Sequence, residues 1–462
     1  MQRAFLLPSP ASAVLLSAAI FGVAHLLSPY HHYELGYSTK SFFLLATNLI
    51  LIATVPICHR FQKGPTRSSL VDTRQFIRVL NSPATQFAFR ICVLLSLIGG
   101  ILKCYDLFVA RSDVFLSDLD VNEKYNANAE TATSIQGVLG SLLYPISLPC
   151  ILLVAARKRI GLPVRRYRLT MAILIAMASI PILNSLLIGK RGAIVAVAAF
   201  GMFFAQYLIG RRFNLREVMI AGIGGTLIFI VLAKVLAHRL EEKGASMLDV
   251  ALTARYTHLM SPSSAMHSIP RVLPDSLDDL FSDYTVFSGY ITHSFPEYLY
   301  LVDQHDLRHC SHGATTFGIV FKLFSYIGLG HYDAAELEGL FPREYVYTTL
   351  FGALFLDFGY ASVLASLLIG LLLVLCYERA RGDIFFVPLY CYLYLVVLWS
   401  PMICFLYMFY GMYYMWATLL FAFGMNAWVF FSQPAVQRHS HVYSTRRASR
   451  RKLRAVQEAA DQ

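Results

Sequence analysis

The chain has 462 residues, of which 56% are hydrophobic and 15% are charged, and its formal net charge is +11. Soluble domains carry roughly 25% charged residues, so this composition excludes an ordinary soluble protein and indicates an integral membrane protein. The positive charge alone would suggest nucleic acid, but the sequence contains no zinc-finger spacing and no aromatic RNA-binding signature. We therefore expect no nucleic-acid partner. The eight cysteines show no CxxC spacing, so we also expect no metal cluster.

A membrane-spanning helix needs roughly 20 apolar residues. The first apolar stretch is longer than the core of a signal peptide and no small-residue cleavage site follows it, so we interpret it as a membrane helix. The predicted spans are residues 6–27, 41–57, 88–110, 135–155, 169–188, 193–209, 218–236, 348–377, 384–400 and 406–431. This order predicts an all-α, polytopic membrane protein with about ten transmembrane helices.

Every second linker between these spans is basic. Together with Arg3, the basic stretches at 58–85, 156–168, 211–217, 378–383 and in the C-terminal tail carry 24 of the 39 Lys and Arg residues. Lys and Arg concentrate in the cytoplasmic loops of membrane proteins. We therefore predict that the basic linkers and both termini are cytoplasmic.

The spans and linkers define four parts of the chain. We predict a seven-helix membrane bundle at 1–236, a large outer segment at 237–347, a three-helix membrane part at 348–431 and a basic cytoplasmic tail at 432–462. The outer segment holds 14 of the 28 acids and eight of the 14 histidines. Segments of this length between elements are usually functional. Its aromatic, half-polar stretches predict helices that lie at the membrane surface.

The pair Lys190 and Arg191 lies in the tight turn between the fifth and sixth spans, on the predicted outer side, where cations are depleted. The planar guanidinium of arginine can donate to two phosphate oxygens at once. Alternatively, both side chains extend to the lipid headgroups without a further role. Cations and aromatic surface helices on one face would suit a lipid-pyrophosphate-linked sugar.

Three stretches carry a family resemblance, which covers about residues 180–375. "LLIGKRGAIVAVAAFG" resembles the G-x-R-G turn of bacterial oligosaccharide repeat-unit polymerases, the Wzy-type O-antigen polymerases. "FPREYVYTTLFGALFLDFGYASVLASLLIG" is similar to the return of that family's chain to the membrane after its large outer loop, and "SDYTVFSGYITHSFPEYLYL" to the aromatic stretch before it.

The resemblance implies a membrane glycosyltransferase of the GT-C type in the bacterial inner membrane. The growing glycan would leave undecaprenyl pyrophosphate, with inversion, and join a hydroxyl of the next lipid-linked repeat unit. The main task is then to stabilise the charge that develops on the pyrophosphate, while a base takes the hydroxyl proton. The implied partners are undecaprenyl-pyrophosphate-linked glycans and membrane lipids, with a chain-length regulator and a flippase as further proteins; no cofactor and no metal are expected.

The resemblance places Arg191 and Arg255 in the catalytic site. His258 could lie on the same helical face as Arg255 and act as a base, or it could be a solvated loop residue. Asp357 lies inside an apolar span, where acids are functional or paired, for example with Lys190 or Arg191. The remaining candidates are grouped as substrate-binding residues, namely Lys190, His238, Arg239, Arg343 and Glu344.

Alternatives stay open for several of these assignments. Glu297 and Glu344 are further candidates for the base, and His238 with Arg239 could simply continue a helix into water. Asp118 and Asp120 form a D-x-D pair that could bind a metal or could arise by chance. For the whole protein, the alternatives are an O-antigen ligase, which uses the same donor, and a flippase or transporter of lipid-linked glycans, which performs no chemistry.

Overall fold

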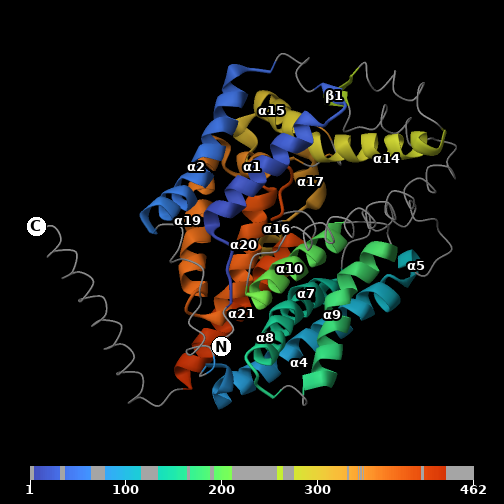
Figure 1. Ribbon diagram of the computed structural model, residues 1–462. Helices are drawn as coiled ribbons and strands as arrows, with labels where there is room; N and C mark the ends of the chain where they lie inside the picture. The colour runs from blue at the N-terminus through green and yellow to red at the C-terminus, as the bar shows by residue number, and fades with distance from the viewer. Residues whose placement is uncertain are drawn as a thin grey trace, which may run out of the picture.

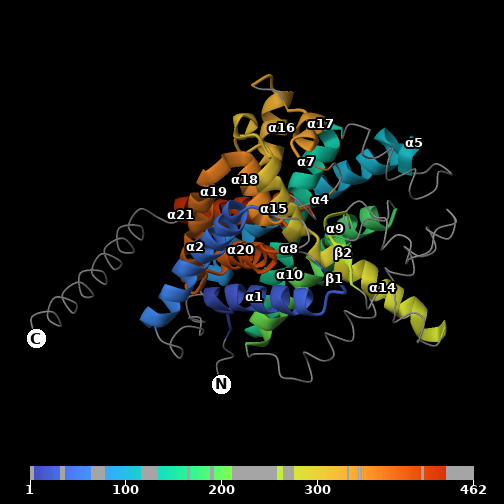
Figure 2. The same cartoon turned by 90° about the horizontal axis from the view of Figure 1, so that it is seen from above.

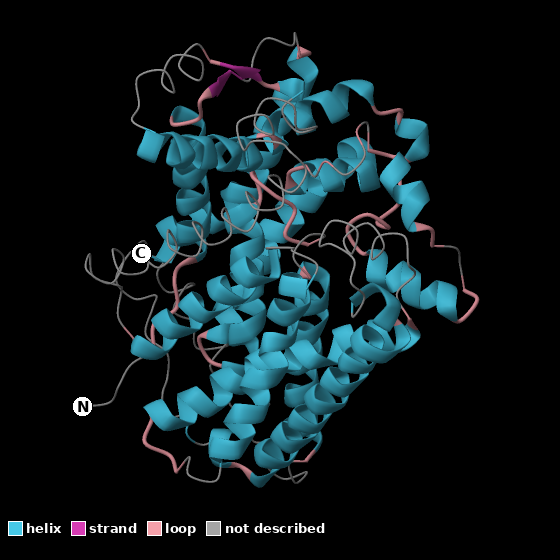
Figure 3. Ribbon diagram, turned by 90° about the vertical axis from the view of Figure 1, so that its right-hand side faces the viewer, coloured by secondary structure: helices cyan, strands magenta, loops and turns pink. Residues whose placement is uncertain are grey.

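The computed structural model describes residues 5–31, 37–63, 77, 79–115, 134–163, 167–187, 192–210, 258–263, 275–329, 332–341, 343, 346, 348–406 and 410–432. Apart from one small ribbon, the regular secondary structure of this part of the chain is helical. In the ribbon, strand β1 (Tyr30–His31) pairs antiparallel with β2 (Ser261–Pro262) (Figure 3). The prediction of an all-α protein is therefore confirmed for the described residues.

The helices of the bundle, in chain order, are α1 (Pro10–Leu26), α2 (Thr39–Lys63), α4 (Pro83–Tyr105), the π-helical turn η1 (Asp106–Ala110), α5 (Ser112–Phe115), α7 (Ile135–Leu143), η2 (Tyr144–Ile146), α8 (Ser147–Arg159), α9 (Arg168–Leu187), α10 (Gly192–Ile209), α18 (Leu350–Phe358), η6 (Gly359–Ala361), α19 (Ser362–Ala380), η7 (Ile384–Phe386), α20 (Val387–Trp399) and α21 (Gly411–Phe431). Between α10 and α18 the structure describes α14 (Asp275–Thr292), α15 (Ser294–Gln304), η5 (Leu307–His309), α16 (Gly318–Tyr326) and α17 (Ala334–Gly339).

Several of these helices are suited to cross a membrane. Within the described residues, six stretches are long and apolar enough to do so, and α1, α10 and the η7–α20 stretch are shorter apolar helices. Each predicted span in the described part falls on one or more of these helices, whereas 218–236 lies outside it. The structure thus agrees with a membrane-embedded helical protein.

The predicted span 348–377 is not one continuous helix. Helix α18 ends after nine residues, and Gly359, with φ of +55° and ψ of −132°, turns the chain before α19 begins. Glycine adopts positive φ without steric penalty, which explains why the break falls at this residue. Asp357 therefore lies next to a helix end, and not in the middle of a long helix.

Helix α7 packs closely against α4 because glycines line their contact (Figure 1). A Cβ atom added to Gly140 would lie 2.7 Å from the main-chain nitrogen of Lys103 and 2.9 Å from the carbonyl oxygen of Gly99. Small residues allow helix backbones to approach each other in membranes. The contact places the start of α7 directly against the end of α4.

Contacts between helix ends show which termini of the helices lie together, and they define two opposite ends of the bundle. At one end, Arg159 at the end of α8 donates to the carbonyl of Ile209 at the end of α10 (2.6 Å), and His59 of α2 meets Glu378 of α19 (2.7 Å). The basic linkers begin or end here, so we call it the basic end.

At the other end, which we call the segment end, the bundle meets residues 275–349. Ser38 before α2 donates its main-chain N–H to Asp303 of α15 (2.9 Å), and Asn184 near the end of α9 donates to the hydroxyl of Tyr410 before α21. Within the described part, successive spans run alternately toward the segment end and toward the basic end. The alternation of the basic linkers predicts this order.

The helices of the 275–349 region cover the segment end (Figures 1 and 2). Helix α14 runs outward across the end of α1, whereas α15 is largely buried against α2 and α18. The sequence predicted surface helices for this region. Helix α15 instead lies mostly inside the fold, with Tyr298 and Leu299 fully buried and Tyr300 partly exposed.

Candidate functional site

A buried ionic cluster lies where α4 ends. Asp106 is fully buried, and its Oδ2 atom contacts Nζ of Lys103 at 2.9 Å and a guanidinium nitrogen of Arg111 at 2.6 Å. Both cations are only 4% exposed. Ser134 donates to the other carboxylate oxygen, Oδ1, at 2.6 Å. Both oxygens of the buried Asp106 carboxylate thus have charged or hydrogen-bonded partners, as burial of charge requires.

Local structure explains why these side chains meet. Lys103 and Asp106 are three residues apart, so they share one face of the helix. The helix then widens into η1, whose end is closed by the hydrogen bond from the N–H of Arg111 to the carbonyl of Asp106 (3.0 Å). π-Helical turns occur frequently at functional sites.

Helix α7 supplies the other wall of the cluster. Ser134 caps α7 by accepting from the N–H of Gly137 (3.0 Å), while its own hydrogen goes to Asp106. A Cβ atom on Gly137 would lie 2.4 Å from the Asp106 carboxyl group. A glycine at this position therefore allows the carboxylate to lie against the helix.

Lys322 of α16 lies close enough to the cluster for their charges to influence each other. The start of α16 is held by Met412, whose sulfur lies 2.9 Å from the N–H of Ile319. Burial lowers the pKa of Lys322, and the nearby charge of Arg111 lowers it further, whereas Asp106 acts in the opposite direction. Among the described residues, two cations therefore contact the Asp106 carboxylate, and Lys322 lies within reach of their charges at the segment end. Such a group can attract a phosphate-type anion.

Sequence reasoning did not single out these residues. Lys103 and Asp106 lie within a predicted span, and Arg111 opens the loop after it. The available signal was an acid and a base three residues apart inside an apolar run, because ionisable residues in a membrane helix are rare unless paired or functional. Lys322 carried no signal, because only the packing of α16 brings it to the cluster.

Asp357, a predicted catalytic residue, is fully buried and holds the chain that leads into α16. Its Oδ1 accepts from the N–H of Thr315 (2.9 Å) and the hydroxyl of Ser311 (2.5 Å), and its Oδ2 accepts from the N–H of Thr316 (2.8 Å). The expected partners Lys190 and Arg191 lie outside the described residues. Because α16 begins two residues after Thr316, this carboxylate fixes the helix that carries Lys322.

Arg343, a predicted binding residue, forms a salt bridge with Glu297 of α15, and its Nε lies 3.2 Å from Oε2 of Glu297. Burial lowers the pKa of Arg343 to about 10, against the opposing effect of the Tyr37 phenol. Burial also raises the pKa of Tyr37 to about 12. This pair thus joins α15 to the segment between α17 and α18, and Glu297 already has a cationic partner.

The other predicted site residues are less informative. His258 is exposed in a short turn beside β2. Arg191, Arg255, Lys190, His238, Arg239 and Glu344 lie outside the described residues, as do Asp118 and Asp120. The structure does not bring Asp357, Arg343 and His258 to a common partner within the part that it describes.

The ionic cluster is thus the described site with the strongest concentration of buried charge. Within the described residues, no three His, Cys, Asp or Glu side chains are grouped as a metal site would require. No family model, no curated protein and no solved structure matches this chain.

Proposed function

We propose that the protein is a polymerase that joins undecaprenyl-pyrophosphate-linked oligosaccharide repeat units into O-antigen, capsular or exopolysaccharide chains. In this proposal it is a GT-C-type glycosyltransferase of the bacterial inner membrane with about ten spans. Both termini are cytoplasmic, and the segment end faces outward. The proposal rests on the resemblance of the "GKRG" turn, the aromatic stretch and the "DFGY" stretch.

The observation that carries the proposal is the buried cluster of Lys103 and Arg111 around Asp106, together with the half-buried Lys322, whose pKa is affected by the charges of Arg111 and Asp106. Phosphate oxygens are bound best by arginine and lysine side chains held in fixed positions. In a site shielded from water, such charges stabilise developing negative charge more strongly than in solution. The cluster lies at the end of the bundle where the proposal requires an anion site.

The proposed reaction breaks the bond between the anomeric carbon of the growing glycan and the pyrophosphate oxygen. An acceptor hydroxyl attacks that carbon from the opposite side, and the electron pair of the broken bond goes to the pyrophosphate. Arg111 and Lys322 would stabilise this charge, with Asp357 holding the helix that presents Lys322. A base takes the hydroxyl proton.

A reconstituted assay tests the proposal. Purified protein in liposomes should convert undecaprenyl-pyrophosphate-linked repeats into longer chains and release undecaprenyl pyrophosphate. Loss of one charge-assisted contact made mainly in the transition state lowers the rate by roughly 10²–10³, and we expect a loss of this order for Lys322→Gln. Lys40→Gln is the matched control, because Lys40 lies at the same end, 5.1 Å from the ring centre of Tyr360.

The same assay separates the alternatives. Transfer of a preformed chain to lipid A-core, without joining of repeats, would favour a ligase. Movement of lipid-linked repeats across the bilayer without any new glycosidic bond would favour a flippase. Either outcome would overturn the polymerase proposal.

A further inference from the structure

Helix α16 is apolar on nearly all sides. Its sequence is "GIVFKLFSY", in which Lys322 is the one charged residue, and the turn after the helix adds Ile327 and Leu329. A helix that is hydrophobic all round is normally covered on every side, either by protein or by membrane hydrocarbon. Protein contacts account for only part of this cover.

Protein covers one side of α16. Ile319 is buried together with Val138 of α7 and Met412 of α21. Val320 and Leu323 pack against the same cluster. The N–H of Ile319 also lies 2.9 Å from the sulfur of Met412. These contacts fix the position of α16 against the bundle.

The end of α16 and the turn after it are exposed. Phe324 is 46% exposed, and Ile327 and Leu329 are 65% and 70% exposed. The turn has a defined structure, because the N–H of Leu329 donates to the carbonyl of Phe324 (2.9 Å) and Gly328 supplies the positive φ of +74°. We call Phe324, Ile327 and Leu329 the apolar tip.

Helix α16 starts at the level where two candidate membrane spans begin. Val138, which packs against α16, is the fourth residue of the span 135–159, and Met412 is the second residue of the span 411–431. The first turn of α16 therefore lies within the apolar part of the bundle, close to its segment end.

The other end of α16 stays at the same level. Burial raises the pKa of Tyr326, and the nearby charge of Asp106 raises it further. Asp106 lies four residues before the end of the span 83–110. The apolar tip, which follows directly, is therefore also held near the segment end of the spans.

Neighbouring helices expose apolar side chains at this level as well. Ile135 and Leu139 of α7 are exposed, as is Val109 of η1. They belong to spans that are long and apolar enough to cross a membrane, so the cover that suits them is bilayer hydrocarbon. Figure 2 shows α16 at the edge of the molecule beside α7. The same cover therefore suits the apolar tip.

The composition of the tip fits the outer part of a lipid leaflet. Residues 323–329, "LFSYIGL", contain no Asp, Glu, Lys or Arg. Aromatic and large aliphatic side chains are favoured at the boundary between headgroups and acyl chains. A charged residue would be costly there, whereas Phe324 and Tyr326 are suited to it.

We propose that the apolar tip inserts into the lipid leaflet at the segment end, at the boundary between headgroups and acyl chains. The tip would keep α16, and with it Lys322, at the membrane surface. The inference does not depend on the proposed polymerase activity.

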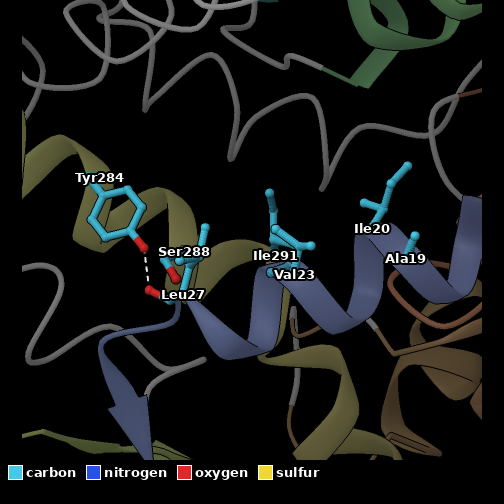
Figure 4. Close-up of a pocket in the computed structure, with 8 residues that line it drawn as sticks. Ala19, Ile20, Val23, Leu27, Tyr284, Ser288 and Ile291 are labelled. Carbon is cyan, nitrogen blue, oxygen red and sulfur yellow. Dashed lines mark hydrogen bonds between the residues drawn. The ribbon is translucent and has the colours of Figure 1, made fainter.

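Lipid photocrosslinking of the wild-type protein tests the inference. Single copies are placed in nanodiscs of phosphatidylethanolamine and phosphatidylglycerol, with a probe lipid that carries a diazirine in the upper part of its acyl chain. Mass spectrometry should find lipid adducts on residues 324–329. The reference is the end of α1, where Leu26 and Leu27 are exposed and the hydroxyl of Tyr284 donates to the carbonyl of Leu27 (Figure 4).

Two variants make the test specific. Ile327→Asp with Leu329→Asp should reduce the adducts on residues 324–329 by about tenfold or more, because each large aliphatic side chain moved from water into hydrocarbon contributes about a factor of ten. Ile327→Leu with Leu329→Ile keeps the tip apolar and is the matched control, which should match the wild type. Adducts at the end of α1 should be the same in all three proteins.

Adducts at the end of α1 without any on residues 324–329 of the wild type would overturn the inference. Equal adducts on the tip of the aspartate variant and of its control would do the same. If the aspartate variant fails to fold, the wild-type result decides. Tip adducts that form in single-copy nanodiscs and disappear in densely packed vesicles would show that a second copy of the chain covers the tip instead.

Discussion

Arg111 and Asp106, five residues apart, form a buried ion pair of 2.6 Å across a π-helical turn at the end of α4. The same carboxylate oxygen also receives Lys103. One acid thus holds two cations inside the protein, and their charges influence the pKa of Lys322, which lies on α16. This arrangement should contribute both to stability and to anion binding.

Asp106→Asn should destabilise the protein strongly. Removing one member of a buried ionic group leaves the others uncompensated, which costs about 3–5 kcal/mol. Ser134→Ala removes one hydrogen bond to the same carboxylate and should cost only about 1.5–3 kcal/mol. Thermal unfolding of the purified variants in one detergent measures both. An Asp106→Asn protein as stable as the wild type would show that the cluster is not held by this carboxylate.

Gly140→Ala should force α4 and α7 apart. The added Cβ atom would meet main-chain atoms of Lys103 and Gly99, which cannot rotate away, and overpacking of this kind costs about 1–3 kcal/mol. Gly201→Ala is the control, because Gly201 of α10 has open space around it and alanine favours helices by up to about 1 kcal/mol. The two unfolding temperatures should therefore move in opposite directions. A rise in the unfolding temperature of both variants would mean that α4 and α7 can move apart without loss of stability.

Asp357→Asn should loosen the chain that leads into α16. In the wild type the two carboxylate oxygens accept from the N–H groups of Thr315 and Thr316. The amide of asparagine has only one acceptor oxygen, and its NH₂ group would face the other N–H donor. Hydrogen exchange at the Thr315 and Thr316 amides should become faster. Glu378→Gln at the basic end changes the same kind of group elsewhere and should leave this exchange unchanged. If hydrogen exchange at these amides is unchanged in Asp357→Asn, the Asp357 carboxylate does not hold α16 in place.

Much of the helical architecture could be predicted from the sequence because membrane spans are long apolar runs and their basic linkers alternate. The break between α18 and α19 depends on Gly359, and hydrophobicity alone does not reveal a turn within an apolar run. The burial of α15 was missed for a similar reason. An aromatic stretch such as "FPEYLYLV" suits a membrane surface and a protein interior equally well.

The candidate site could be predicted only in part. Asp357 and Arg343 were identified as unusual, but their partners, Thr315, Thr316 and Glu297, follow from tertiary packing that no local pattern encodes. Lys322 shows the limit most clearly, because it is over 200 residues from Arg111 in sequence and yet influenced by its charge. The roles of Arg191 and Arg255 stay predictions, since both lie outside the described residues.

Anion binding at the cluster should weaken at alkaline pH. The pKa of Lys322 is lowered, so this lysine loses its charge at a lower pH than an exposed lysine does, and the attraction for an anion falls through that range. Lys322→Arg should extend binding to higher pH, because arginine stays protonated. Calorimetric titration with inorganic pyrophosphate across alkaline pH measures the difference. Identical pH profiles for the two proteins would remove Lys322 from the anion site.

The glycolipid profile of a deletion strain tests the proposed function most directly. If the host makes O-antigen, loss of a polymerase should leave core that carries a single repeat unit, because repeats are still flipped and ligated. The wild-type gene and Lys40→Gln should restore long chains, whereas Lys322→Gln at equal protein level should not. Bare core together with long chains on undecaprenyl pyrophosphate would contradict the polymerase and indicate a ligase. Bare core with single repeats held on the cytoplasmic face would indicate a flippase.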